Sequence, residues 1–428
     1  MRYELLNKDV VTLTFELDAL CRVVGQLEPL DLAFAPPSVV GLDGTARVDD
    51  VAAWWSRRSI PATRLHLGRL LDALGLDSAS PLALHSLGLS LSDRYWVRPA
   101  GSDLAWADVN FFDNDFDGAL GTLTLNPWAS PVAADLAATS LMSPDSTVGG
   151  DVPKRWVIDR DGRRILVKAP SRRYDQDPYN EVVACALYRR LMADADYVTY
   201  WLVGDADVTC CACPNMLGED EELVSAADLM RRHGRGSAPT YPNVLRALEQ
   251  DSGLPPRHLA QWLSRMFSCD FLLANSDRHL GNFGLVRDCV TLEYRRVAPI
   301  FDSGCSLWCD TRRLESPGDY RYHPRPFPGR PSQDPASQLR LFSDYGWLDA
   351  VASTTQDLAA WQDEARDALA LDPDLPAARL DAIMRGVRDN VAAFLAHVER
   401  SARLCPATAV GTGVVPSSRE GDDGTTRR

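Results

Sequence analysis

Apolar side chains alternate with polar ones in two runs near the start of the chain, residues 10–17 and 22–34. A period of two is typical of β-strands with one buried face. From about residue 47 to 75 the period becomes that of a helix that ends at a glycine. One face of this segment is formed by Leu67, Leu70, Leu71 and Leu74. The first 130 residues are therefore predicted to form an α+β region.

A second group of elements follows residues 126–148, which are rich in Ala, Ser and Pro and typical of a linker. Two apolar runs within residues 154–170 flank Asp161 and Gly162, a dipeptide that favours a β-hairpin turn. Residues 178–193 then predict a helix, because their apolar positions recur on one face. That face is formed by Val183, Leu187 and Leu191.

A third group of elements lies in the C-terminal half. Residues 262–274 have a helical pattern and lead into the polar loop NSDRHLGN, residues 275–282. Apolar runs at residues 283–286 and 297–301 predict two strands after this loop. Residues 316–338 are rich in Pro, Gly and polar side chains, and they predict a long mobile segment.

These groups predict four parts in a chain of 428 residues: an N-terminal accessory region (1–130), a small lobe (140–218), a mainly helical lobe (219–405) and a tail (406–428). The tail lacks aromatic residues and consists of small and polar ones, which is a composition typical of disorder. The link between the two lobes is expected near PNMLGE, residues 214–219.

Composition narrows the range of functions. The formal net charge of −14 disfavours a direct nucleic-acid partner, because binding to a phosphate backbone depends on clustered cations. No apolar stretch approaches the roughly 18 residues of a membrane helix, and the N-terminus does not resemble a secretion signal. The chain is therefore expected in the cytoplasm, with its ten cysteines mostly as thiols.

Two short motifs contain some of the residues that metal sites require. Residues 210–213 contain three cysteines but have no second CxxC or His pair nearby, so a strand of small residues is preferred to a zinc site. Residues 113–118, DNDFDG, match the start of an EF-hand calcium loop. Thr124 stands where that loop needs a bidentate Glu, so a solvated acidic turn is preferred.

Lysine is rare in this chain, since three of the 45 basic residues are Lys and the others are Arg. Lys168 ends the second strand of the predicted hairpin, where a compact ammonium suits a phosphate contact. Glu181 lies near the start of the following helix. We predict that Glu181 pairs with Lys168; the alternatives are a surface lysine and an acidic residue favoured by the helix dipole.

The loop at residues 275–282 carries candidate catalytic groups. Asp277 and Asn282 are five residues apart, as in protein-kinase catalytic loops, where the Asp meets the acceptor hydroxyl and the Asn binds a metal. Asp302 follows the predicted strand 297–301, with Gly304 allowing a sharp turn. A carboxylate and an amide oxygen suit Mg²⁺, so Asn282 and Asp302 are the predicted metal ligands.

A glycine-rich stretch precedes these motifs, STVGGDVPKRW at residues 146–156. Paired glycines let a backbone approach a phosphate and present its N–H groups, although a plain hairpin turn has a similar composition. The candidate phosphate contacts are Ser146, Thr147, Gly149, Gly150 and Lys154. Together with Lys168, Glu181 and the Asp277 loop, the stretch has the order of parts of a two-lobed kinase-like fold that uses ATP.

At these motifs the sequence resembles the HipA-like kinases over roughly residues 1–400. The resemblance rests on SLSDRYWVRP, VNFFDNDF, TVGGDVPKRW, PYNEVVA, NSDRHLGNFG and PIFDSGCSLW. The DRHxxN form is also similar to the catalytic loop of phosphoinositide kinases, a related fold. The resemblance implies an α+β two-lobed kinase that phosphorylates protein Ser or Thr.

Residue by residue, the resemblance implies Asp277 as catalytic base and Lys168 as a phosphate contact oriented by Glu181. It implies phosphorylation of the loop itself, with Ser146 and Thr147 as candidate acceptors, and an antitoxin partner. Residues 316–338 lie where an activation segment would. His279 is expected only to orient the loop, and Ser303 replaces the Phe that follows the metal Asp in many protein kinases.

Two other functions stay open. A small-molecule kinase resembling aminoglycoside or choline phosphotransferases shares the Asp-x₄-Asn loop, and GEDEE at residues 218–222 could bind a cationic acceptor. A pseudokinase that binds nucleotide without transfer is the other, with the N-terminal region as its working surface. The complete set of Lys, Glu, Asp, Asn and Asp favours an enzyme.

Overall fold

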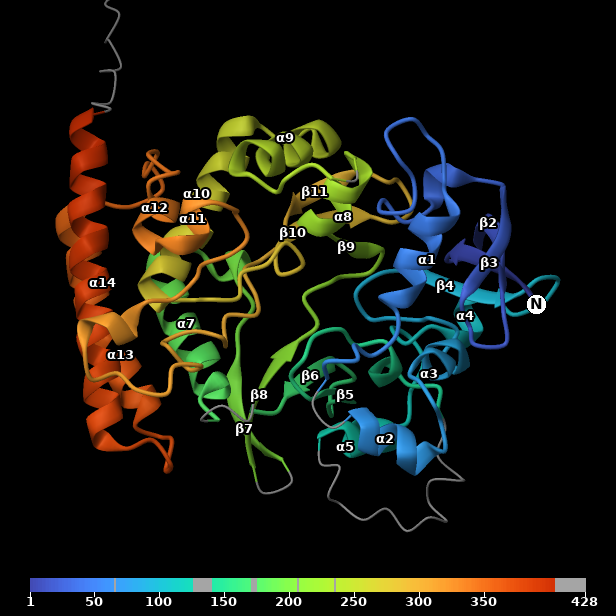
Figure 1. The fold of residues 1–428 in the computed structure, drawn as a ribbon, viewed down its shortest axis with the longest axis horizontal. Helices are drawn as coiled ribbons and strands as arrows, with labels where there is room; N and C mark the ends of the chain where they lie inside the picture. The colour runs from blue at the N-terminus through green and yellow to red at the C-terminus, as the bar shows by residue number, and fades with distance from the viewer. Residues whose placement is uncertain (65–66, 126–140, 171–174, 206–207, 235, 405–428) are drawn as a thin grey trace, which may run out of the picture.

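The structure is a computed structural model that describes residues 1–428 apart from 65–66, 126–140, 171–174, 206–207, 235 and 405–428. The described part combines three antiparallel sheets with helices, most of which gather around the C-terminal half (Figure 1). The predicted α+β class is confirmed. Most of the predicted linker and the predicted disordered tail lie outside the described residues.

The N-terminal sheet has the strand order β3-β2-β1-β4. Its strands are β1 (Arg2–Asn7), β2 (Val10–Leu17), β3 (Val23–Pro29) and β4 (Tyr95–Pro99). β2 and β3 coincide with the two alternating runs. β1 was not predicted, because Leu5 and Leu6 are both fully buried and pack in separate clusters, so the strand lacks the alternation of a half-exposed one.

The first 130 residues also form helices, of which those at residues 48–56, 80–85 and 106–109 bury side chains against this sheet. The helices are α1 (Val48–Ser56), α2 (Leu67–Leu74), α3 (Ser80–His85), α4 (Trp106–Val109) and α5 (Ala119–Leu125). The segment predicted as one helical stretch is thus divided into α1 and α2, with Pro61 in the interruption, where it can donate no backbone hydrogen bond. Gly75 ends α2 in the left-handed conformation.

The second sheet has the order β5-β6-β8-β7. Its strands are β5 (Lys154–Ile158), β6 (Arg164–Lys168), β7 (Trp201–Asp205) and β8 (Val208–Pro214). The predicted hairpin is confirmed as β5 and β6, in which Lys154 lies opposite Lys168. The three cysteines of β8 are buried within the sheet, as the preferred strand interpretation requires.

α7 (Asp177–Leu191) follows β6 and is the predicted helix beginning near Pro178. A third sheet of order β11-β10-β9 contains β9 (Glu221–Ser225), β10 (Gly284–Asp288) and β11 (Tyr294–Val297). The predicted strand 297–301 is wrong: β11 ends at its first residue, and Ile300 forms only an isolated bridge with Tyr197. Pro299 has no N–H for a ladder.

The remaining helices surround α10 (Pro256–Leu273), which leads to the catalytic-loop sequence. They are α8 (Ala226–Arg232), α9 (Tyr241–Ser252), α11 (Arg330–Gln333), α12 (Pro335–Leu339), α13 (Val351–Leu369) and α14 (Ala377–Leu404). α13 and α14 form an outer layer beside α7 and α10 (Figure 1). Trp361 of α13 donates to the Val183 carbonyl of α7 at 3.1 Å, which fixes this layer to the site helix.

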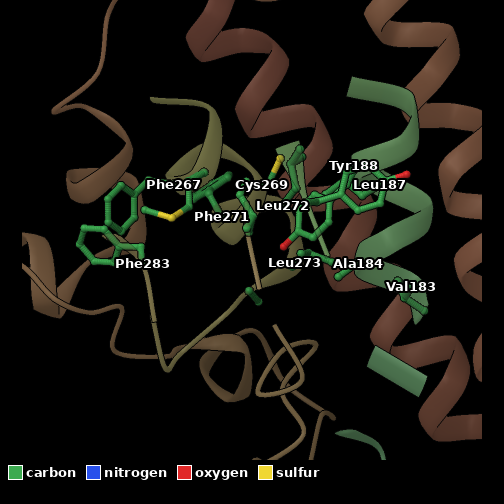
Figure 2. Packing of buried hydrophobic residues seen from close by; sticks show 14 of the residues in the cluster. Val183, Ala184, Leu187, Tyr188, Phe267, Cys269, Phe271, Leu272, Leu273 and Phe283 are labelled. Carbon is green, nitrogen blue, oxygen red and sulfur yellow. The ribbon is translucent and has the colours of Figure 1, made fainter. Parts of the chain in front are cut away.

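The main core joins α7 to α10 (Figure 2). Leu187 and Tyr188 of α7 face the α10 side, and Phe267 lies beside Phe283 from the start of the strand that follows the catalytic loop. Burial of such large apolar groups fixes both helices. The helix that carries Glu181 and the loop that carries Asp277 are therefore parts of one packed core.

Residues 316–338, predicted as mobile, are attached to this core. Phe327 is 1% exposed and its ring centroid lies 5.0 Å from that of Phe267. Trp308 donates to the Tyr320 carbonyl at 2.8 Å. The prediction missed these buried aromatic contacts because Pro and polar residues dominate the composition of the segment. Within the described residues, no helix is both long enough and apolar enough to cross a membrane.

Candidate active site

Lys168 is the centre of a buried polar cluster. Its Nζ donates to Glu181 Oε1 at 3.0 Å, to Asp302 Oδ1 at 2.7 Å and to the Tyr200 hydroxyl at 3.1 Å. The side chain is 8% exposed and that of Glu181 is 3% exposed. All three ammonium protons therefore have a partner, and the predicted pairing of Lys168 with Glu181 is present.

Local backbone structure holds the acidic groups of the cluster. Glu181 Oε2 accepts the Ser303 N–H at 2.9 Å, so this carboxylate binds both the lysine and the chain beside Asp302. Asp302 has a φ of +58°, a left-handed conformation that is costly for a residue with a side chain. The sharp turn thus falls on Asp302; Gly304 allows close approach to α7, since a Cβ there would lie 3.2 Å from the Asp177 carbonyl oxygen.

The charges of the cluster stabilise one another. Burial alone would raise the pKa of Asp302, but Lys168 and Lys154 more than offset it, so this pKa is held well below its usual range. Burial alone would lower the pKa of Lys168, and the two nearby carboxylates raise it instead. Around neutral pH Asp302 is therefore a carboxylate and Lys168 an ammonium, whereas burial raises the pKa of Glu181 above its ordinary value although Lys168 lowers it.

The catalytic-loop sequence begins where α10 ends at Ala274, which caps the helix in the left-handed conformation. Asn275 Oδ1 accepts the Asp277 N–H at 2.9 Å and Nδ2 donates to Asp270 at 2.8 Å. The Nδ1 atom of His279 accepts the Gly281 N–H at 3.0 Å, an orienting contact of the kind expected for that residue. Side-chain hydrogen bonds to the backbone thus hold the loop.

Arg278 joins the two segments that carry the predicted metal ligands. Its guanidinium is fully buried, pairs with Asp270, and donates from one nitrogen to the carbonyls of Asn282 at 3.1 Å and Phe301 at 2.5 Å. A second nitrogen donates to Ser303 Oγ at 2.8 Å. The residues before and after Asp302 are therefore tied to the end of the Asp277 loop.

Asn282 and Asp302 retain free oxygen atoms. The Asn282 side chain donates from Nδ2 to the Asp277 carbonyl at 3.2 Å, and within the described residues its Oδ1 accepts no hydrogen bond. Asp302 Oδ2 likewise has no donor among the residues described. No three His, Cys, Asp or Glu side chains of the described residues form a metal cluster, but Mg²⁺ needs only one or two protein oxygens besides water and phosphates. The donors present therefore fit Mg²⁺.

Asp277 is paired with Arg325 of the segment 316–338. The distance between Asp277 Oδ1 and Arg325 Nη1 is 2.8 Å. Burial raises the pKa of Asp277 above its ordinary value, whereas His279 and Arg325 lower it. An Asp with a raised pKa that is half exposed at a loop tip is suited to accept a proton, once an acceptor hydroxyl replaces the guanidinium.

The glycine-rich stretch lies next to this cluster but presents a different surface from the one predicted. Ser146 and Thr147 are buried, and their hydroxyls donate away from the site, to the Ser143 carbonyl at 2.7 Å and the Leu89 carbonyl at 2.5 Å. Gly150 has a φ of +87°, and a Cβ there would lie 2.7 Å from Lys154 Nζ. The backbone and Lys154 therefore form the phosphate-facing candidates.

Three of the four carboxylates of the acidic stretch at residues 218–222 are in ion pairs, and Glu219 is exposed. Asp220 pairs with Lys8, Glu221 with Arg296, and the buried Glu222 with Arg287 at 2.6 Å. A cationic acceptor would have to displace these arginines and the lysine. The side chains of Asp113, Asp115 and Asp117 are exposed, so the EF-hand-like stretch lies at the surface.

Four residues that contact parts of this site were missed in the sequence: Tyr200, Arg278, Arg325 and Arg64, whose guanidinium donates to carbonyls of the glycine-rich loop. Tyr200 precedes β7 and contacts Lys168 only through the fold. Arg278 lies inside the recognised DRHxxN motif, so its position could have been found, but its bridge to Phe301 depends on tertiary structure. Arg325 lies in the segment predicted to be mobile, and Arg64 lies in the N-terminal region. No local sequence pattern marks either arginine as part of the site.

In this site Lys168 of the β5–β6 hairpin is paired with Glu181 of α7, and Asp302 follows β11 of the third sheet. This arrangement defines a protein-kinase-like class of site. A chain of the solved complex of the toxin–antitoxin proteins HipA and HipB with operator DNA, from Shewanella oneidensis MR-1, is similar to this chain. The TM-score is 0.55, with 14% identity, 93% of this chain and 97% of that chain covered. The predicted HipA-like, kinase-like fold is confirmed.

In sequence, this chain is 30% identical over 139 residues to the serine/threonine-protein kinase CtkA of Helicobacter pylori (strain J99). The match covers 32% of this chain and 42% of that kinase, less than half of its length. The crystal structure of a Helicobacter pylori kinase CtkA gives a TM-score of 0.44 at 19% identity and covers 59% of this chain and 94% of that one. No protein-family model matches the chain.

Proposed function

We infer that the protein is an ATP- and Mg²⁺-dependent phosphotransferase whose acceptor is a Ser or Thr hydroxyl of a protein. The observation that carries this proposal is the contact of Lys168 with both Glu181 and Asp302 in one buried cluster. Phosphoryl transfer depends mainly on positioned charges of this kind, because the protein has little covalent chemistry to perform. The likeness to a named serine/threonine kinase supports the class of acceptor.

In this proposal the chain's residues have separate roles. Lys168 contacts the phosphates while Glu181 and Tyr200 hold its ammonium. Mg²⁺ held by Asn282 and Asp302 would neutralise charge on the phosphate oxygens. Asp277 accepts the proton of the acceptor hydroxyl, whose oxygen forms a bond to the terminal phosphorus as the bond to the ADP oxygen breaks.

Two contacts must change during such a cycle. Lys168 has to release Asp302 before its ammonium can contact a phosphate, because its three donors are taken. Arg325 has to leave Asp277 before an acceptor hydroxyl can reach the carboxylate. Phosphorylation of Ser146 or Thr147 would require their loop to withdraw from the N-terminal region, because both hydroxyls are buried and bonded there. An acceptor on a separate protein needs no such withdrawal, and we favour it. An antitoxin partner stays a prediction.

Mass spectrometry after incubation with Mg-ATP tests the proposal. The purified chain is incubated alone and with dephosphorylated casein, and phosphopeptides are mapped. We expect Mg²⁺-dependent phosphate on Ser or Thr of the chain or of casein, and none with Asp277→Asn. Asp310→Asn, a change of an exposed carboxylate in the same half, should leave transfer unchanged.

Three outcomes would contradict the proposal or one of its assignments. ATP binding without any transfer would favour the pseudokinase. Phosphate found only on an added aminoglycoside or on choline would favour the small-molecule kinase. The structure gives that function little support, because Glu221 and Glu222 are already paired with arginines and are not free to bind a cationic acceptor. Full transfer by Asp277→Asn would remove the assigned base.

A further inference from the structure

Arg64 of the N-terminal region holds the backbone of the glycine-rich loop. Its Nε donates to the Gly150 carbonyl at 2.6 Å, and its Nη2 donates to the carbonyls of Val148 at 2.5 Å and Gly149 at 3.1 Å. The neighbouring Thr63 hydroxyl donates to Asp151 at 2.5 Å. Three successive carbonyls are thus turned toward one guanidinium, which is 3% exposed.

The N–H groups of the same loop have no such partner. From residue 148 to residue 152, no amide donates a hydrogen bond to any residue that the structure describes. Successive free amides in a loop with a left-handed glycine form an anion-binding concavity. Because the carbonyls are occupied by Arg64, the loop can present its donors to a ligand without also presenting acceptors.

Two buried cations next to this loop have donor groups without partners. Lys154 is 8% exposed and forms no hydrogen bond or ion pair with the described residues, and a Cβ on Gly150 would lie 2.7 Å from its Nζ. Arg64 Nη1 is buried and, among the described residues, has no hydrogen-bond partner. Buried, positively charged donors without a hydrogen-bond partner are costly, so these groups indicate a polyanionic ligand.

We propose that Arg64 is a positioning residue: through it the N-terminal region holds the glycine-rich loop in the conformation that receives the phosphates of ATP. The inference rests on the proposed function. It assigns the N-terminal region a role in nucleotide binding, because the contacts of Arg64 with Val148, Gly149 and Gly150 cross from that region to the small lobe. Lysine could not replace Arg64, since one ammonium cannot span three carbonyls in the manner of a planar guanidinium.

The test compares ATP with adenosine, which lacks the phosphates. Titration calorimetry measures both ligands on the wild-type chain, Arg64→Met, Arg64→Lys and the control Arg22→Met, an exposed arginine of the same region that pairs with Asp18. We expect Arg64→Met to weaken ATP binding at least about tenfold, as the loss of charged hydrogen bonds implies. Adenosine affinity should be unchanged, and Arg64→Lys should fall between wild type and Arg64→Met for ATP.

Kinetics separate positioning from a general loss of structure. We expect KM for ATP to rise at least about tenfold in Arg64→Met while kcat at saturating ATP stays within about threefold. If Arg64→Met does not fold, Arg64→Lys decides through its ATP affinity and its KM. Arg22→Met should match the wild type.

The outcomes distinguish the inference from the proposed function. Equal ATP binding by wild type and both Arg64 variants would overturn the inference alone. Equal weakening of ATP and adenosine would also overturn it, because the effect would not involve the phosphates. Failure of the wild-type chain to bind ATP would overturn the proposed function and the inference together.

Discussion

Two lysines face each other across one β-hairpin and have opposite surroundings. Lys154 and Lys168 are register partners on β5 and β6, and their exposures are 8% and 7%. Lys168 has three hydrogen-bond partners, whereas Lys154 has none among the described residues. Burial lowers the pKa of Lys154 to about 8, while Asp302 and Glu181 reverse that effect at Lys168. Two equally buried lysines therefore differ in pKa and in their hydrogen-bond partners.

The difference divides the site into two sides. On the Lys168 side, the ammonium has three hydrogen-bond partners within the protein before any ligand arrives. On the Lys154 side, the ammonium and the loop amides have no hydrogen-bond partner in the described chain, so a polyanion would complete them. In the proposed function, the Lys168 side would hold Mg²⁺ and the Lys154 side would receive the phosphates of ATP.

Asp302→Asn should produce the largest effect, because it removes the carboxylate that Lys168 contacts and Lys154 does not. We expect phosphate transfer to fall by at least about 10²–10³-fold, as for loss of one preorganised electrostatic contact. The chain should remain folded, since Glu181 still pairs with Lys168. Radiolabelled transfer assays measure the loss, with Asp310→Asn as the control; near-normal turnover in Asp302→Asn would contradict the assignment.

Lys168→Met and Lys154→Met should have opposite effects on stability. Removing Lys168 leaves Glu181 buried without its counter-ion, which costs about 3–5 kcal/mol of unfolding free energy. Removing Lys154 deletes an unpaired buried charge, so the unfolding free energy should stay the same or rise. Urea denaturation of the ligand-free proteins measures both values. A similar loss of stability in the two variants would show that the two sides do not differ.

ATP affinity should depend on pH through Lys154. In the ligand-free site its pKa is about 8, and a bound phosphate raises it, so binding takes up protons. Affinity should therefore be constant below about pH 7 and decline as the pH rises through 8, by up to about tenfold per unit. Calorimetry across this range on the wild type and Lys154→Met checks the slope. An equal slope in the variant would assign it to another group.

Arg325→Gln should give the smallest effect. Arg325 lowers the pKa of Asp277, so its removal raises that pKa further. Asp277 must be deprotonated to accept a proton, so activity is lost as the pH falls through its pKa, and this acidic limb should move to higher pH. The profile of kcat/KM against pH measures the limb. A limb at the same position would exclude Asp277 as the group that titrates.

The sequence identified the residues of this site more fully than it identified the contacts among them. The order of a Gly-rich loop, Lys168, Glu181, the Asp277 loop and Asp302 was sufficient to predict a kinase-like fold. The direction of the Ser146 and Thr147 hydroxyls could not be predicted from the sequence. It depends on segments some 60 residues earlier in the chain, such as the one at Leu89. Local pattern identifies residue types, whereas partners across the fold decide whether a buried lysine is paired.

The same limit applies to the elements. Residues 297–301 looked like a strand because they are apolar, but Pro299 and the turn at Asp302 prevent a ladder. Residues 316–338 looked mobile because Pro and polar residues dominate them, yet buried aromatic rings such as Phe327 fix them beside the catalytic loop. Single anchors of this kind have no periodicity that a sequence pattern could show.

Titration of the wild-type chain and Lys154→Met with ATP at pH 7, with and without Mg²⁺, tests the two-sided site most directly. We predict one nucleotide bound per chain, tighter with Mg²⁺ than without, and at least about tenfold weaker in Lys154→Met with the Mg²⁺ dependence retained. Identical affinities for the two proteins, or binding that ignores Mg²⁺, would contradict the account.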